Sequence, residues 1–360
     1  MPLTPLMQRV LDKSIRPRRH LAALLRYGTV RRFANVALVE AERMLGRSTV
    51  YGKPYMLVVD PVNICNLKCP LCPTGRGDLP LRNGKMKREA FEELFQIMGP
   101  WAFKLMLYNW GEPFLHKDIL TMIEFAHKKG VATSLSTNLN HLPKGGAEGI
   151  VNSGLDDMIV SCDGLSQKTY ARYRVGGNVK DVFRNLREIA KAKRRLGKTT
   201  PVIEFQFLVF KHNEHQIPRV REMAKRCGAN FVRIMPPYIG PNKAGIEPSQ
   251  NPLYRKNANM SDNQKPDVFE RGADLTTLAK ENPPPLNCFW PWRSMVINWN
   301  GQVDPCCFKN YHESFGNVFE DGFEAIWNGE TYRYARQWIS GKAENNPNMK
   351  IVCRGCGGYG

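Results

Sequence analysis

The sequence predicts an α/β fold in which a parallel sheet is wound into a full or partial barrel. Short apolar segments alternate with helical segments six times between residues 55 and 237, the pattern of parallel strands joined by crossover helices. The 360 residues are 42% hydrophobic and 24% charged, which is typical of a soluble globular protein. This composition excludes a disordered or low-complexity chain.

Each expected strand is short and apolar, and each is followed by a segment with apolar residues at helical spacing. In such a barrel, functional side chains belong at the carboxyl ends of the strands. We expect strands at 55–60, 103–110, 131–138, 157–164, 202–210 and 230–237, and helices near 86–99, 118–130, 143–153, 179–196 and 214–227.

The segments on either side of the barrel differ from it in amino-acid composition. Residues 1–50 predict a basic helical N-terminal extension of two helices, and residues 51–237 form the barrel core. Residues 238–287, rich in Pro and Asn, are expected to be a linker or lid. Residues 288–360 predict a small Cys-bearing domain, with a hairpin at 295–303 that turns at Asn300–Gly301 and a helix near 322–340.

The chain is strongly basic. There are 52 Lys and Arg against 33 Asp and Glu, a net charge of +19, and residues 1–50 hold +7 of it, with ten basic and three acidic residues. A basic amphipathic helix can lie on an anionic membrane, although a basic helix face is more often solvated, which would make this segment a helical cap on the barrel. With neither an 18-residue apolar stretch nor a secretory signal, we expect a cytoplasmic protein, either free or membrane-associated through its N-terminal helices.

A first cysteine cluster directly follows the first expected strand. Cys65, Cys69 and Cys72 are spaced C-x3-C-x2-C, and three thiolates this close suit an iron–sulfur cluster. Three ligands leave one iron of a four-iron cluster open to a non-protein ligand. The alternative is a zinc site completed by a distant Cys or His, but a loop at the end of a barrel strand is where active sites lie.

This loop resembles that of the radical S-adenosylmethionine (radical SAM) superfamily, whose hallmark is C-x3-C-x2-C after the first strand of a partial (β/α)6 TIM-like barrel. The resemblance implies that the open iron binds the methionine amino and carboxylate groups of SAM. It also implies that the 4Fe–4S cluster, reduced by a donor such as flavodoxin or ferredoxin, cleaves SAM to a 5′-deoxyadenosyl radical that abstracts a substrate hydrogen. Leu71 stands at a position that is often aromatic in the family and leaves an apolar contact for adenine.

The resemblance extends to other expected strand ends. Asn109-Trp110-Gly111-Glu112-Pro113 looks like the family's Gly-Gly-Glu-Pro motif, which holds the SAM amino group, with Trp110 in place of the first Gly. Arg174 resembles an arginine that pairs with the SAM carboxylate. Taken alone, such residues are also common as caps, turns and surface charges. The expected SAM-binding residues are Leu71, Gly111, Glu112, Pro113, Ser136, Asn138, Ser161, Asp163 and Arg174.

Cys288, Gly301-x4-Cys306 and a terminal Cys353-x2-Cys356 form a second cysteine cluster. This arrangement resembles the SPASM/twitch extension of radical SAM enzymes, which holds auxiliary iron–sulfur clusters. Its four expected ligands suffice for one fully ligated 4Fe–4S cluster, although four thiolates that include a C-x2-C pair also suit a zinc ribbon. Cys307 adjoins Cys306, and we favour Cys306 because it completes Gly-x4-Cys. Cys162 and Cys227 are expected to be buried small hydrophobes. The expected metal ligands are Cys65, Cys69, Cys72, Cys288, Cys306, Cys353 and Cys356.

The resemblance predicts a radical SAM oxidoreductase or maturase-type enzyme. Our main expectation is oxidation, dehydrogenation or other modification of a carbohydrate-like or lipid-linked small molecule. Residues 1–50 look too short and too helical for the winged-helix unit that peptide-modifying relatives often carry. The alternatives are maturation of a ribosomal peptide or protein, RNA modification, and a non-catalytic iron–sulfur or zinc protein. The sequence has no aromatic-plus-basic RNA-binding motif, so nucleic acid is not an expected partner.

Overall fold

The computed structural model describes residues 5–79, 81–237, 245–255, 288–307, 314–344, 346, 348–354 and 356, and only the backbone of residues 5–13 and 15. One eight-stranded sheet has the order β6-β5-β4-β3-β2-β1-β7-β8. All neighbouring strands are parallel except the last pair. The strands are β1 Met56–Val59, β2 Lys104–Met106, β3 Ala132–Thr137, β4 Asp157–Ser161, β5 Val202–Leu208, β6 Phe231–Met235, β7 Ser294–Ile297 and β8 Val303–Asp304. This open sheet confirms the expected partial barrel.

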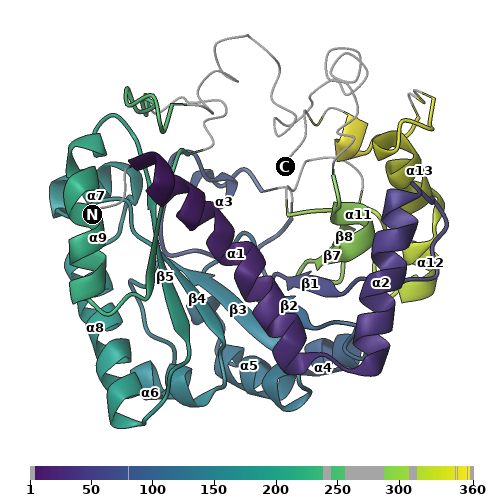
Figure 1. The fold of residues 1–360 in the computed structure, drawn as a ribbon, viewed down its shortest axis with the longest axis horizontal. Helices are drawn as coiled ribbons and strands as arrows, with labels where there is room; N and C mark the ends of the chain where they lie inside the picture. The colour runs from purple at the N-terminus through teal and green to yellow at the C-terminus, as the bar shows by residue number, and fades with distance from the viewer. Residues whose placement is uncertain are drawn as a thin grey trace.

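Helices follow the strands along the chain, so the crossovers expected for a parallel sheet are present (Figure 1). In the described ranges, none of the helices has the length and apolar character needed to cross a membrane. The helices are α1 Pro5–Tyr27, α2 Val30–Met44, α3 Pro73–Arg76, α4 Arg88–Met98, α5 Ile119–Lys128, α6 Gly146–Asn152, α7 Gln167–Tyr173, α8 Val179–Arg195, α9 Ile217–Arg226, α11 Trp290–Arg293, α12 Phe323–Trp327 and α13 Glu330–Ile339, with 3-10 turns η1 Pro113–Leu115, η2 Glu214–Gln216 and η4 Val352–Arg354.

The two faces of the sheet differ in character. Because side chains alternate along a strand, β5 turns Ile203, Phe205 and Phe207 to one side, where all three are fully buried in the core. Its other side carries Glu204 and Gln206, both of which contact Arg16 of α1. The apolar side packs against core helices, and the polar side faces the N-terminal helix.

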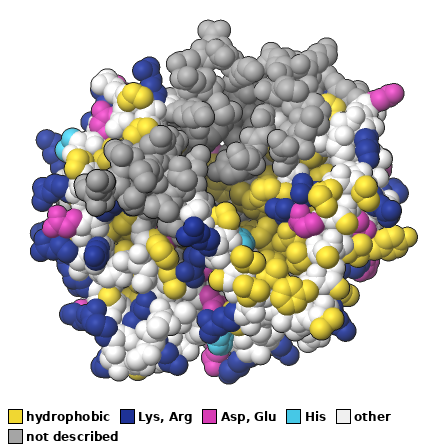
Figure 2. Space-filling model, in the orientation of Figure 1, with side chains coloured by type: hydrophobic (Ala, Val, Ile, Leu, Met, Phe, Trp, Pro, Cys, Tyr) yellow, Lys and Arg dark blue, Asp and Glu magenta, His cyan; other side chains and the backbone are white. Residues whose placement is uncertain are grey.

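The N-terminal extension consists of the two expected helices. α1 crosses in front of the strands in Figure 1, and Arg16 and Arg19 form ion pairs with Glu204 and Asp157. α2 lies beside α11 and is tied to it by Glu40, whose carboxylate accepts hydrogen bonds from Arg293 Nε at 2.6 Å and from the Tyr55 hydroxyl at 2.6 Å. In Figure 2 hydrophobic side chains gather over these two helices.

The C-terminal segment continues the barrel sheet, a pairing that the sequence patterns do not reveal. β7 runs parallel to β1, with Leu57 opposite Met295. The hairpin from β7 to β8 confirms the expected turn, and Gly301 there has φ +88°, which favours glycine. The single helix expected near 322–340 is instead α12 and α13, which are separated at Asn328–Gly329. Of the expected linker, only residues 245–255 lie within the described part.

Candidate functional site

The first cysteine loop leaves the carboxyl end of β1 and ends in α3, which begins directly after Cys72. Two backbone contacts shape it: Cys72 N–H donates to the Cys69 carbonyl at 3.1 Å, and Lys68 N–H donates to the Val175 carbonyl at 2.9 Å. The Leu67 N–H points at Cys65 Sγ, 3.4 Å away. The loop is therefore held at the expected edge of the sheet, beside the segment that follows α7.

The loop packs without a gap against the Asn-Trp-Gly-Glu-Pro segment. A Cβ atom on Gly111 would lie 1.7 Å from the Val62 carbonyl oxygen, so no side chain fits at this position. The next residue, Glu112, donates its N–H to the Ile64 carbonyl at 2.9 Å. Glycine at residue 111 thus lets two loops from neighbouring strands, β1 and β2, touch through their backbones.

Burial favours the protonated form of two thiols of this loop. It raises the pKa of Cys65 to about 11 and that of Cys69 to about 12, and the charges of neighbouring thiolates, including Cys72, act in the same direction. Iron supplies the positive charge that such buried thiolates lack. Cysteines of an iron–sulfur cluster bind different irons, and in the described residues no three Cys, His, Asp or Glu side chains converge on a single metal ion. Three thiols on one loop at the end of β1 are the kind of donor set that holds the implied cluster.

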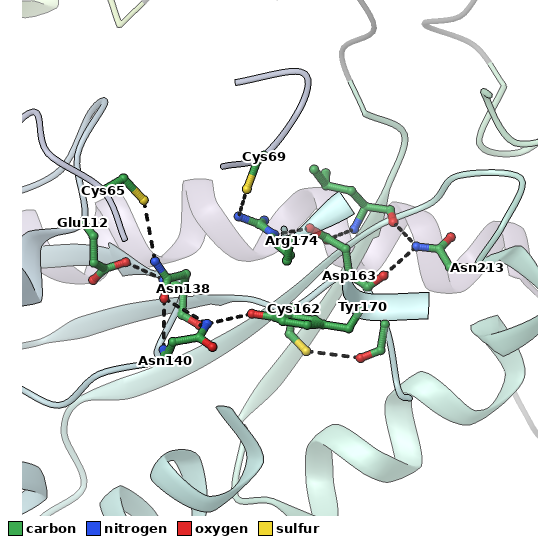
Figure 3. Close-up of polar contacts among 12 residues, drawn as sticks. Cys65, Cys69, Glu112, Asn138, Asn140, Cys162, Asp163, Tyr170, Arg174 and Asn213 are labelled. Carbon is green, nitrogen blue, oxygen red and sulfur yellow. Dashed lines mark hydrogen bonds and ion pairs between the residues drawn. The ribbon is translucent and has the colours of Figure 1, made fainter. Parts of the chain in front are cut away.

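Glu112 joins the ends of β2 and β3. Its carboxylate accepts hydrogen bonds from the Thr137 hydroxyl and from Asn138 N–H, both at 2.7 Å. Burial raises the pKa of Glu112 to about 7, against these hydrogen bonds, which lower it. Asn138 in turn places its amide nitrogen 3.8 Å from Cys65 Sγ. A carboxylate expected to bind SAM is thus also the residue that positions Asn138 beside the first cysteine (Figure 3).

Arg174 and Asp163 form a buried ion pair next to the second cysteine (Figure 3). Arg174 Nε donates to Asp163 Oδ2 at 2.6 Å, and Arg174 Nη1 lies 4.0 Å from Cys69 Sγ. The other oxygen of Asp163 accepts the Leu208 N–H at 2.7 Å. Burial lowers the pKa of Arg174, but Asp163 outweighs it and holds the pKa above its ordinary value. The arginine is a fixed cation, not a surface charge.

Two residues that the sequence analysis did not single out complete this network. Asn66, inside the cysteine loop, accepts a hydrogen bond from the Asn138 side chain at 2.9 Å. Asn213 donates to the carbonyls of Asp163 and Leu208, both at 2.9 Å, and so fixes the strand ends around the ion pair. The sequence could have indicated Asn66, because this residue lies between two of the predicted ligands. Asn213 lies in no recognisable motif, so nothing in the sequence indicated its role.

The remaining expected SAM contacts lie on the same edge of the sheet. Ser136 is half-buried near the end of β3, and Ser161 is buried at the end of β4. Pro113 begins the turn after Glu112, and Leu71 packs on an apolar group that includes Tyr173 and Phe210. The structure thus places these residues around the cysteine loop, and their contacts with SAM remain predictions.

The second set of cysteines comes from three separate segments. Burial, together with the charge of a Cys356 thiolate, raises the pKa of Cys288 to about 11. Burial also raises the pKa of Cys353, with Cys288 and Cys356 adding to it. These thiols are therefore close enough to repel one another as thiolates, an arrangement that suits an iron–sulfur cluster. Cys306 lies two residues after the end of β8, and the assignment of Cys306 rather than Cys307 stays a prediction. Cys162 and Cys227 are buried, as expected.

Comparison with known proteins shows to which family the chain belongs. Residues 59–224 match the radical SAM superfamily, and residues 288–357 match the SPASM iron–sulfur cluster-binding domain. The chain belongs to the radical SAM superfamily and carries a C-terminal SPASM domain. The first domain implies a 4Fe–4S cluster and SAM, and the second implies auxiliary iron–sulfur clusters.

The relatives of this radical SAM enzyme differ in what they act on. It is 24% identical over 308 residues to the tungsten-containing aldehyde ferredoxin oxidoreductase cofactor-modifying protein of Pyrococcus furiosus, covering 78% of this chain and 82% of that one. It is 21% identical over 286 residues to the PqqA peptide cyclase of Gluconobacter oxydans, covering 78% of each. The fold is similar to that of Streptococcus suis SuiB bound to S-adenosylmethionine, with TM-score 0.60, 17% identity, and coverage of 85% of this chain and 73% of that one.

Proposed function

We propose that this radical SAM enzyme modifies a peptide or protein by removing a hydrogen atom from it. The observation that carries the proposal is the similarity to the PqqA peptide cyclase over 78% of the chain, joined by 23% identity to the subtilosin biosynthesis protein AlbA of Bacillus subtilis. The fold is also that of SuiB, which has been crystallised with its precursor peptide SuiA. These relatives favour the maturase alternative over the small-molecule reading that the sequence analysis placed first.

The bound 4Fe–4S cluster would supply the electron that cleaves SAM and so starts hydrogen abstraction. Cys65, Cys69 and Cys72 would hold that cluster. Arg174, fixed by Asp163, presents a guanidinium group suited to the SAM carboxylate. Asn138, fixed by Glu112, would place its amide beside the cluster and the bound SAM.

The SPASM domain gives the enzyme a second redox group. Cys288, Cys306, Cys353 and Cys356 would hold one auxiliary 4Fe–4S cluster, and β7 joins their segment to the barrel sheet. We propose that this cluster either accepts the electron left on the substrate, which makes the reaction a two-electron oxidation, or anchors the substrate. In the first role the protein is an oxidoreductase as well as a maturase.

A second candidate is modification of a small molecule, which was our main expectation from the sequence. Two observations favour it. The segment before the barrel is a pair of helices, α1 and α2, rather than a unit containing strands. The similar proteins also include a cofactor-modifying protein and the Fe-coproporphyrin III synthase of Methanosarcina barkeri, 24% identical over 297 residues.

The two proposed functions can be distinguished by identifying the cell fraction that stimulates SAM cleavage. The cluster-loaded enzyme is incubated anaerobically with SAM, reductant and extract of the source cells, divided by size and treated or not with protease, and 5′-deoxyadenosine is measured. We expect stimulation by the large fraction that protease destroys. Stimulation confined to a protease-resistant small-molecule fraction contradicts the peptide proposal and establishes the second candidate.

A further inference from the structure

The apolar side chains on the surface of this enzyme are concentrated in its N-terminal helices. In the described part of the chain twelve large hydrophobic side chains are exposed, and eight of them lie between residues 21 and 51. Scattered single hydrophobics on a surface need no explanation, but a contiguous set does. We call this set the N-terminal apolar face; it consists of Leu21, Leu25, Val30, Phe33, Leu38, Met44, Leu45 and Tyr51.

α1 turns its polar side inward and its apolar side outward. Arg16 and Arg19, one helical turn apart, form ion pairs with the polar inner face of the barrel. Two turns further on, the Tyr27 hydroxyl donates to Asp156 at 2.7 Å. On the opposite side, Leu21 is 57% exposed and Leu25 is 67% exposed. An ordinary surface helix has the reverse arrangement.

α2 has the same inverted arrangement. Its buried residues include Arg32, Asn35 and Glu42. Arg32 donates to the Tyr27 carbonyl at 2.7 Å and to the Gly99 carbonyl at 3.0 Å, and Glu42 accepts the Gly52 N–H at 3.0 Å. Outward, Val30 is 87% exposed. These buried hydrogen bonds fix the rotation of α2 about its axis. Burying its apolar side would require the helix to rotate and to lose these hydrogen bonds.

The exposed charged side chains of this segment have one sign. The exposed charged residues between 16 and 51 are all arginines: Arg18, Arg26, Arg31 and Arg47. The two acidic residues of this stretch, Glu40 and Glu42, are half-buried and buried, and both accept hydrogen bonds within the protein. Within residues 16–51, the segment therefore combines exposed apolar side chains with exposed arginines, and none of its carboxylates is exposed.

We propose that the N-terminal apolar face docks the enzyme on the surface of an anionic lipid bilayer. Apolar side chains enter the boundary between headgroups and acyl chains while arginines pair with the lipid phosphates and negative headgroups, the recognition used by interfacial helices. A second copy of this chain fits the face less well, because a symmetric contact brings its arginines against each other. The exposed apolar side chains come from two helices that are joined by a short turn, α1 and α2, and from the segment directly after α2. The proposal does not depend on which substrate the enzyme modifies.

Flotation of the full-length, cluster-loaded enzyme with lipid vesicles tests this proposal. We expect binding to vesicles of phosphatidylcholine mixed with phosphatidylglycerol, weaker binding at high salt, and little binding to phosphatidylcholine alone. The double variant Leu25→Gln/Phe33→Gln should bind about tenfold or more weakly, because it loses two apolar insertions. The matched control Ile97→Gln/Phe319→Gln, whose parent side chains are 41% and 37% exposed elsewhere on the protein, should bind as the wild type does.

The same proteins are assayed for SAM cleavage, which reports whether the fold and the reactive cluster are intact. Retained cleavage with lost vesicle binding supports the proposal. The proposal is overturned by a wild type that does not float with anionic vesicles, by equal binding to neutral vesicles, or by equal loss of binding in the control variant. A dimer that dissociates in the Leu25→Gln/Phe33→Gln variant, with no vesicle binding, overturns it in favour of a second copy. The vesicle experiment does not involve the substrate, so its interpretation stays the same if the enzyme proves not to modify a peptide.

Discussion

Arg174 shows how one buried charge is prepared for a ligand. The guanidinium group uses Nε for Asp163 at 2.6 Å, and Nη1 reaches toward Cys69. Burying such a pair costs desolvation free energy, and the Leu208 N–H, which donates to the other carboxylate oxygen of Asp163, helps to offset that cost. The sequence predicted Arg174 and Asp163 as separate SAM contacts; the structure makes Asp163 the residue that positions Arg174.

Replacing Arg174 tests this role. We expect Arg174→Gln to weaken SAM binding to the cluster-loaded enzyme by about 10- to 100-fold, because a charge-assisted hydrogen bond is lost. Equilibrium dialysis measures the affinity, and Arg172→Gln, at an exposed site on the same helix, is the control. Iron content should be unchanged. Unaltered SAM affinity would remove Arg174 from the site.

Glu40 gives a pH-dependent contribution to stability. Burial would raise its pKa, but Arg293, Tyr55 and Arg43 outweigh burial and lower it to about 2 from the usual 4.5. The folded-state pKa lies below that of the unfolded chain, so the stabilisation is complete above about pH 4.5 and is lost as the pH falls toward 2. We expect Glu40→Gln to lower the free energy of unfolding by roughly 2 kcal/mol at pH 7.

Urea denaturation of wild type and variant at several pH values measures this contribution. The difference between the two proteins should shrink as the pH falls below 4.5. A difference that stays constant down to the lowest accessible pH would show that the Glu40 carboxylate charge is not the source of the stabilisation.

At the scale of elements, the site depends on loops that touch through their backbones. Gly111→Ala would place a methyl group against the Val62 carbonyl, so the β1 and β2 loops must separate. We expect a loss of about 3 kcal/mol in the free energy of unfolding together with loss of iron from the first cluster. Gly149→Ala in α6 is the control, since its new Cβ meets only the end of the Leu120 side chain at 2.8 Å. Equal iron content in the two variants would contradict this account.

Local patterns predicted most elements, because each depends on nearby residues. The six parallel strands, the two N-terminal helices and the Asn300–Gly301 turn are all present. Which side of each N-terminal helix is buried could not be predicted in the same way. The buried residues of α2 are Arg32, Asn35, Val39 and Glu42. Arg32 and Asn35 can be buried because their hydrogen-bond partners at Gly99 and Lys53 come from other segments of the chain.

For the whole molecule, the main feature that sequence patterns did not reveal is the continuity between the barrel and the SPASM segment. β7 pairs with β1 across more than 230 residues of sequence, and no local pattern specifies such a partner. The cysteine spacings, in contrast, were sufficient to indicate two metal clusters, because ligand spacing is a local property of the chain. The exact SAM contacts depend on side-chain geometry that spacing does not determine.

The two clusters should be separable by mutation. We expect Cys288→Ala/Cys353→Ala to remove about half of the iron while SAM cleavage continues, because the auxiliary ligands form a separate set from the first loop. Iron and 5′-deoxyadenosine are measured on the same reconstituted protein. Loss of nearly all iron would show that the two sites do not assemble independently.

The most direct test of the account is SAM cleavage by the enzyme reconstituted anaerobically with iron and sulfide. With SAM and dithionite, the wild type should produce 5′-deoxyadenosine, and so should Cys227→Ala, which alters a buried cysteine outside both clusters. Cys69→Ala should produce none. A wild type that holds its full iron content and leaves SAM intact, or a Cys69→Ala variant that cleaves SAM at the wild-type rate, would contradict the assignment of the C-x3-C-x2-C loop as the reactive centre.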